Sequence, residues 1–165
     1  MICSFLRSSL YHFSVNPPHF ALVLDWLKDR TINVTIGAFF VLYANIDNFD
    51  PTKYTLDYDN LPVMDKWLLS KLNSVVKTVD DCLANYKIPE SARALQEFVD
   101  EMSNWYVRRS RERFWAKGME QDKINAYMTL YTALVTISKA AAPMIPFMTE
   151  EIYQNLVRSV DKEAI

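Results

Sequence analysis

Between Met64 and Tyr86, apolar residues recur at alternating steps of three and four positions, the spacing of one face of an α-helix. This apolar stripe consists of Met64, Leu68, Leu72, Val75, Val79, Leu83 and Tyr86. The opposite face is filled by Asp65, Lys66, Lys71, Lys77, Asp80 and Asp81. The segment therefore predicts a long amphipathic helix that buries one side against its neighbours.

The remainder of the second half has the same period. Pro89 opens a second helix, because proline is tolerated in a first turn, and this helix ends near Gly118. A third helix is expected at about residues 120–142 and a fourth at about 147–160. The three stripes are Ala92, Leu95, Val99, Met102 and Tyr106, with Phe98 and Trp105 alongside; Ile124, Met128, Tyr131, Val135 and Ser138; and Met148, Ile152, Leu156 and Val160.

The N-terminal part has a different character. After Pro17 and Pro18, residues 19–28 are consistent with a short apolar helix. Residues 32–46 are expected to form a buried helix, although their β-branched start leaves a strand open. Residues 48–62 are a polar, aspartate-rich connector. We divide the chain into an atypical N-terminal segment, residues 1–33, and a helical domain, residues 34–165.

Four long helices with short connections bury their stripes most simply as an antiparallel bundle, so the expected fold class is all-α. The 165 residues contain only two glycines. An all-β domain or a dinucleotide-binding α/β domain would normally need more of them for turns and phosphate loops. Half of the residues are hydrophobic, which is enough to build a core.

No catalytic centre is indicated. No carboxylate pair has a distinctive setting, and no Gly-rich phosphate loop is present. Cys3, Cys82, His12 and His19 form no ligand pattern, so we expect no metal site. The apolar run from Ala38 to Ala44 is too short to cross a bilayer. We expect a soluble, cytoplasmic protein with no membrane partner.

The segment from Asn104 to Trp115 combines arginines with aromatic side chains. The segment contains four arginines and one acid, Glu112, so its local charge is +3 in a chain whose net charge is -2. Guanidinium groups grip phosphates and rings stack on bases, so this composition favours RNA. The alternative is a solvated helix face, or arginines paired with acids of neighbouring helices. The candidate RNA-binding residues are Arg108, Arg109, Arg111, Arg113 and Trp115.

On a helix, these arginines spread over roughly 200° of the circumference, so they cannot all contact one ligand. The two pairs that share a face are Arg109 with Arg113 and Arg108 with Arg111. We expect one pair to be structural and the other to meet phosphate. Trp105 should pack in the core, whereas Trp115 suits either a stacking surface or the core.

Four stretches carry a family resemblance: F-F-V-L-Y-A-N-I-D, D-K-W-L-L-S-K-L-N, the run from Ala92 to Trp115, and A-P-M-I-P-F-M-T-E-E-I-Y-Q-N-L. From about Ala38 onward they resemble the helical anticodon-binding domain of isoleucyl-tRNA synthetase, a class I aminoacyl-tRNA synthetase. Valyl and leucyl enzymes share the bundle and the last motif and are the near alternatives. The arginine-rich W-Y-V-R-R-S-R-E-R-F-W favours the isoleucyl type.

By this resemblance, the parent enzyme attaches isoleucine to its tRNA with ATP and magnesium, and the bundle docks the anticodon stem and loop. These residues contain neither the H-I-G-H nor the K-M-S-K-S type signature of the catalytic domain, and residues 1–33 do not match the family. Where the family usually has tryptophan, asparagine and tyrosine, this chain has Val34, Thr35 and Gly37.

We therefore expect a fragment that lacks the catalytic domain, needs no cofactor and is inactive alone. Its expected partners are isoleucine tRNA and the catalytic domain of the same enzyme. The alternative is a structural helical bundle that has no RNA affinity and self-associates.

Overall fold

The computed structural model describes the backbone of residues 30–158 and the side chains of residues 36–157. The helix expected at 19–28 lies outside this part. The described elements are α3 (Arg30–Ile46), η1 (Pro51–Lys53), α4 (Val63–Ala84), α5 (Ile88–Glu101), η2 (Met102–Val107), α6 (Arg108–Trp115), α7 (Gln121–Ala141), α8 (Pro146–Tyr153) and η3 (Gln154–Arg158). All are helical, which confirms the all-α prediction and excludes the strand at 32–46. None of these helices is long and apolar enough to cross a membrane.

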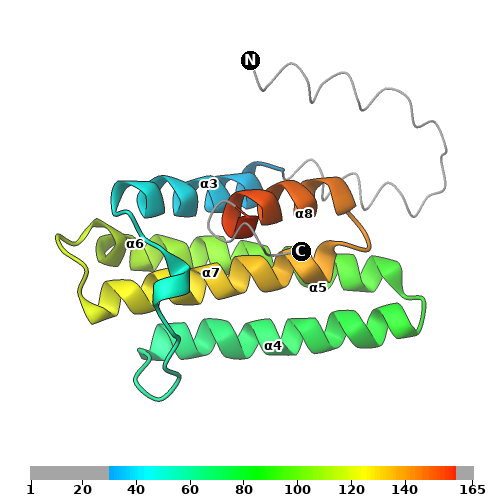
Figure 1. Cartoon of the computed structure of the whole chain (residues 1–165). Helices are drawn as coiled ribbons and strands as arrows, with labels where there is room; N and C mark the ends of the chain where they lie inside the picture. Colours follow the sequence, from blue (N-terminus) through cyan, green and yellow to red (C-terminus); the bar gives the residue numbers. More distant parts are fainter. Residues whose placement is uncertain (1–29, 159–165) are drawn as a thin grey trace.

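The helices form an antiparallel bundle with α7 at its centre (Figure 1). α4 turns back into α5, which continues through η2 and α6 as one long helix. α7 returns between these helices and the α3–α8 side of the bundle. Because it has neighbours on several sides, twelve of its 21 residues are buried, more than the single stripe that the sequence predicted.

Aromatic rings join the elements at one end of the core. The ring of Tyr127 in α7 lies with its centroid 4.9 Å from that of Phe114 in α6 and 4.6 Å from that of Phe49 in the connector. Phe40 of α3 completes the group, 5.9 Å from Tyr127. Stacked and edge-to-face pairs stabilise by about 0.5–1.5 kcal/mol beyond the burial of their area. This cluster fixes the end of α6, where the arginines lie.

A wide turn in the long helix decides which side chains face the core. η2 is a π-helical segment, and a π turn holds one residue more than an α turn, so it rotates the following residues by roughly 100°. In a regular α-helix Phe98 and Phe114 would point about 160° apart. The wide turn reduces this to about 60°, and both rings are buried, at 2% and 1% exposure.

Two stripe predictions are wrong. Trp105 lies within η2 and is 50% exposed, because the wide turn rotates it out of the core face. Tyr86 is 90% exposed, because α4 ends at Ala84 and Tyr86 adopts a left-handed conformation with φ 58° in the following turn. The rest of the second stripe is buried as predicted, namely Ala92, Leu95, Phe98, Val99, Met102 and Tyr106.

Candidate nucleic-acid interface

Arg113 of α6 points into the bundle. Its Nη1 and Nη2 atoms donate to the two carboxylate oxygens of Asp65, each at 2.8 Å. Its Nε donates to Oδ2 of Asp122 at 2.8 Å, and Nη2 also donates to the Asp122 carbonyl oxygen at 2.9 Å. A bidentate pair between guanidinium and carboxylate is among the strongest hydrogen-bonded contacts in proteins. Arg113 thereby links α6 to the start of α4 and the start of α7.

Asp65 is the buried end of this network. Its carboxylate is fully buried, not on the polar face of α4 as the sequence predicted, and it also accepts a 2.8 Å hydrogen bond from the hydroxyl of Tyr106. Burial alone would lower the pKa of Arg113, but its hydrogen bonds to Asp65 and Asp122 outweigh burial and raise that pKa. Arg113 is therefore a permanent internal cation.

This geometry separates Arg113 from the other candidates. Four of the five guanidinium N–H donors are engaged within the bundle, and the side chain is only 18% exposed. The expectation of a structural arginine pair is corrected to one structural arginine, because Arg113 lies beside Asp65 and Asp122, whereas Arg109, one turn earlier, is exposed. We leave Arg113 out of the interface proposed below.

A second buried ion pair fastens the same, C-terminal end of α6. The Nζ of Lys123, whose side chain is 4% exposed, lies 2.8 Å from Oδ2 of Asp47 and donates to the carbonyl oxygen of Ala116 at 2.8 Å. The hydroxyl of Tyr127 donates to the same Asp47 oxygen at 2.5 Å. Because Asp47 follows α3 and Ala116 follows α6, Lys123 ties both ends to α7. The sequence analysis missed this network.

Both networks predict a loss of stability at alkaline pH. Burial, and then the neighbouring Asp65, raise the pKa of Tyr106 well above its ordinary value; burial and Asp47 do the same for Tyr127. Above about pH 10 the unfolded chain loses these protons while the folded chain keeps them. Stability should then fall by up to about 1.4 kcal/mol per pH unit for each tyrosine.

Urea unfolding at pH 8, 10 and 11 measures this slope. The double variant Tyr106→Phe, Tyr127→Phe should flatten it, although its stability at pH 8 is lower. Tyr86→Phe is the matched control, because that phenol is 90% exposed, and it should keep the slope of the parent. Equal slopes for the double variant and the control would contradict the prediction.

The other three arginines stay at the surface. Arg108, Arg109 and Arg111 are all exposed. The guanidinium carbon of Arg109 lies 4.4 Å from the ring centroid of Trp105, so these two side chains stack as a cation–π pair. Glu112 is also exposed on α6, which leaves this surface with a cationic excess.

Trp115, at the end of α6, is 56% exposed, so the stacking-surface alternative fits its position and the core alternative is wrong. Its Nε1 donates to the hydroxyl of Tyr43 on α3 at 2.8 Å. The hydrogen bond fixes one edge of the indole against α3 while leaving over half of the side chain accessible. A ring held in this way is suitable for stacking, because little rotational freedom remains to be lost.

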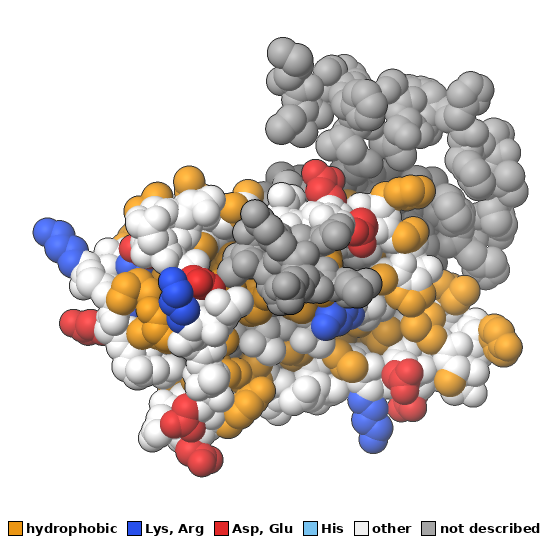
Figure 2. Space-filling model, in the orientation of Figure 1, with side chains coloured by type: hydrophobic (Ala, Val, Ile, Leu, Met, Phe, Trp, Pro, Cys, Tyr) orange, Lys and Arg blue, Asp and Glu red, His pale blue; other side chains and the backbone are white. Residues whose placement is uncertain are grey.

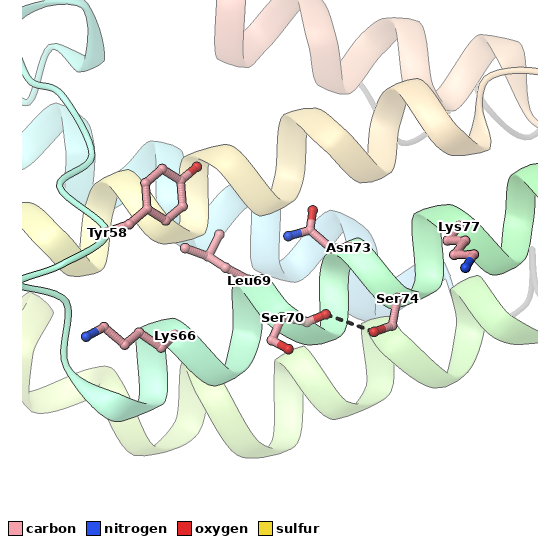
Figure 3. A pocket seen from close by; sticks show the side chains of 7 residues that line it. All are labelled: Tyr58, Lys66, Leu69, Ser70, Asn73, Ser74 and Lys77. Atoms are coloured by element: carbon pink, nitrogen blue, oxygen red, sulfur yellow. Dashed lines mark hydrogen bonds between the residues drawn. The ribbon is translucent and has the colours of Figure 1, made fainter.

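A shallow groove lies elsewhere, along the outer face of α4 (Figure 3). Its volume is about 540 Å³, and none of the candidate residues lines it. Lys66 at one end donates to the Asp59 carbonyl oxygen at 2.9 Å, and Ser74 donates to the Ser70 carbonyl oxygen at 3.0 Å. Figure 2 shows basic and acidic side chains scattered over one face of the molecule. Among the described residues visible on that face, no broad cationic patch is seen.

No cluster that could hold a metal ion occurs among the described residues. The described part therefore presents a surface of three exposed arginines and two exposed tryptophans on a helix that is fastened internally by Arg113 and Lys123. Guanidinium groups and indole rings of this kind are suited to binding phosphates and stacking on bases.

Comparison with known proteins assigns the chain to a family. The model of the anticodon-binding domain of tRNA ligases matches residues 65–165, which is more than half of the chain. The chain belongs to this family. The match begins at the buried Asp65 and includes the whole arginine helix.

The chain has close relatives among isoleucine–tRNA ligases. It is 60% identical over 130 residues to the ligase of Clostridium novyi strain NT, covering 79% of this chain and 12% of the relative. It is 56% identical over 130 residues to that of Clostridium tetani, with the same coverage. It is 52% identical over 130 residues to that of Dehalococcoides mccartyi strain CBDB1, covering 79% of this chain and 13% of the relative. The chain thus spans about one eighth of the length of these relatives and corresponds to their anticodon-binding region.

Proposed function

We propose that this chain binds the anticodon stem and loop of isoleucine tRNA through the exposed side of α6. The observation that supports this most directly is that the arginines of α6 differ in their exposure and in their contacts. Arg113 is engaged inside the bundle, whereas Arg108, Arg109 and Arg111 keep their guanidinium groups at the surface. Phosphate contacts dominate RNA affinity, and arginine forks match phosphate geometry. Trp115 adds a ring at the end of the same surface.

In this proposal, a separate catalytic domain attaches isoleucine to the tRNA. The relatives are isoleucine–tRNA ligases roughly six to seven times as long, so attachment of isoleucine with ATP and magnesium would take place in a catalytic domain that this chain joins as a partner. The proposed role places the chain in the cytoplasm, where tRNA is charged. The bundle would contribute position and affinity, holding the anticodon arm while the catalytic domain acts on the other end of the tRNA.

Substitution of the exposed arginines tests the proposal. Binding of an isoleucine tRNA transcript to the double variant Arg108→Gln, Arg111→Gln should weaken about tenfold or more at low salt. Its salt dependence should become shallower by about 0.7–0.9 for each phosphate that the variant no longer neutralises. Arg93→Gln, an exposed arginine on α5 of the same long helix, is the matched control and should bind like the parent. Fluorescence anisotropy over a salt series measures both quantities.

Two results would count against RNA docking here. One is parent-like binding by the double variant. The other is a parent chain that binds no tRNA but sediments as a dimer or larger species at the same concentration. The exposed apolar residues Leu42 and Ile46, at 57% and 64% exposure on α3, are the surface that would support such self-association.

A further inference from the structure

Trp105 stands apart from the other exposed apolar side chains, because it is both stacked and accessible. Arg109 lies over its ring at 4.4 Å, yet half of the side chain remains exposed. The wide turn η2 puts it there: without the extra residue, Trp105 would share the face of Phe98, seven positions earlier and about 20° away. The fold therefore presents a large ring to solvent at the point where it also presents three arginines.

We propose that Trp105 and Arg109 form a stacking platform for one unpaired RNA base. This inference rests on the proposed function and deepens it, because it assigns recognition of single-stranded loop nucleotides to a defined pair of side chains. An RNA base would add a third layer to the stack formed by the Trp105 indole and the Arg109 guanidinium. Unstacked loop bases are recognised in this way, on aromatic rings and on arginine planes.

The surroundings of the pair support an RNA base over an apolar protein surface. The exposed residues near the pair are Asn104, Arg108 and, one turn beyond Arg109, Glu112, all of them polar. An amide beside a stacked base can hydrogen-bond to its edge, and an arginine beside it can hold the adjoining phosphate. The core of a protein interface would instead surround the tryptophan with apolar side chains and few charged ones. Cationic and aromatic groups in alternation are the composition of single-strand binding surfaces.

Two RNA probes separate this inference from the proposed function. One is the anticodon arm of isoleucine tRNA as a hairpin with its unpaired loop, and the other is a blunt duplex of the same stem. The parent chain should prefer the hairpin. Trp105→Ala should weaken hairpin binding about 5- to 100-fold and leave duplex binding nearly unchanged, since stacking contributes per unpaired base. Trp105→Phe should retain most of the preference.

Arg111→Gln is the matched comparison, because it removes a phosphate contact without touching the platform, and it should weaken both probes by a similar factor. A spectroscopic readout accompanies the titration: hairpin binding should quench tryptophan emission in the parent more than in Trp105→Phe. Because Trp105 is exposed, the variants Trp105→Ala and Trp105→Phe should keep the helical circular dichroism of the parent.

Each outcome has one meaning. Loss of the hairpin preference in Trp105→Ala, with quenching lost in Trp105→Phe, supports the platform. Hairpin binding that is unchanged in Trp105→Ala overturns the platform and leaves the proposed function intact. A parent chain that binds neither probe overturns both. If Trp105→Ala binds RNA normally but no longer associates with the catalytic part of the ligase, the ring serves a protein contact and the platform is rejected.

Discussion

Replacing Arg113 with alanine is expected to destabilise the bundle by about 3–5 kcal/mol, because the fully buried carboxylate of Asp65 then lacks its countercharge. Domains of this size are stable by only about 5–15 kcal/mol, so the variant loses a large share of that margin. Urea unfolding followed by circular dichroism measures the change. Tyr106 would remain as a hydrogen-bond donor to Asp65, and this limits the loss without removing it.

Arg111→Ala is the control for the Arg113 prediction. It lies two residues earlier on the same helix and is exposed, so its effect on stability should stay within about 0.5 kcal/mol. Removing the whole network at once, in the triple variant Asp65→Leu, Tyr106→Phe, Arg113→Met, should destabilise less than Arg113→Ala alone. Apolar residues of similar volume can replace a buried ion pair at little cost. A loss below about 1 kcal/mol in Arg113→Ala would show that water reaches Asp65.

Asp47→Ala is expected to destabilise by about 3 kcal/mol or more, because it removes the countercharge of the buried ammonium of Lys123. Lys123→Met should cost less. The carboxylate that this variant leaves behind is 20% exposed and can be hydrated, whereas the ammonium is 4% exposed. The decisive quantity is the difference between the two losses of stability, with Asp47→Ala losing more than Lys123→Met.

Thermal and urea unfolding of both variants test this order. Asp80→Ala on the exposed face of α4 is the control and should change stability by less than about 0.5 kcal/mol. If Lys123→Met is the more destabilising variant, the ammonium contributes mainly through the Ala116 carbonyl, and the ion pair with Asp47 is secondary.

Both networks join an arginine or lysine near the candidate interface to an acid far away in sequence. Arg113 and Asp65 are 48 residues apart, and Lys123 and Asp47 are 76 apart. Under the proposed function, both networks would hold the C-terminal end of α6 against α4, α7 and α3. The exposed arginines would then be presented on a rigid element, which lowers the entropy cost of RNA binding.

The helices were readable from the sequence because burial on one face imposes a period that shows in a single chain. The predicted helix at about 120–142 corresponds to α7 at Gln121–Ala141, and the helix from Met64 corresponds to α4 from Val63. The all-α bundle followed from these stripes and the scarcity of glycine. The family resemblance also came from local runs of residues, and the family comparison confirmed it.

The sequence also contains a weaker signal of the buried ion pairs, which the sequence analysis did not use. Asp65 stands three positions before Leu68 and seven before Leu72, so it occupies the apolar stripe of α4. Lys123 likewise stands four positions before Tyr127 and seven before Leu130, both fully buried. A charged residue at a stripe position predicts a buried partner of opposite charge, because an unpaired charge in the core is too costly to keep. The partner itself could not be named from the sequence.

Helical period and residue chemistry are local properties, so they were enough to predict a bundle of amphipathic helices with one arginine-rich, aromatic segment. Which arginine is internal and which tryptophan is exposed became visible in the folded bundle alone. Those outcomes depend on one extra residue in the turn η2 and on acids supplied by distant helices. The four arginines of one helix differ by their angle to neighbours that the local sequence does not contain.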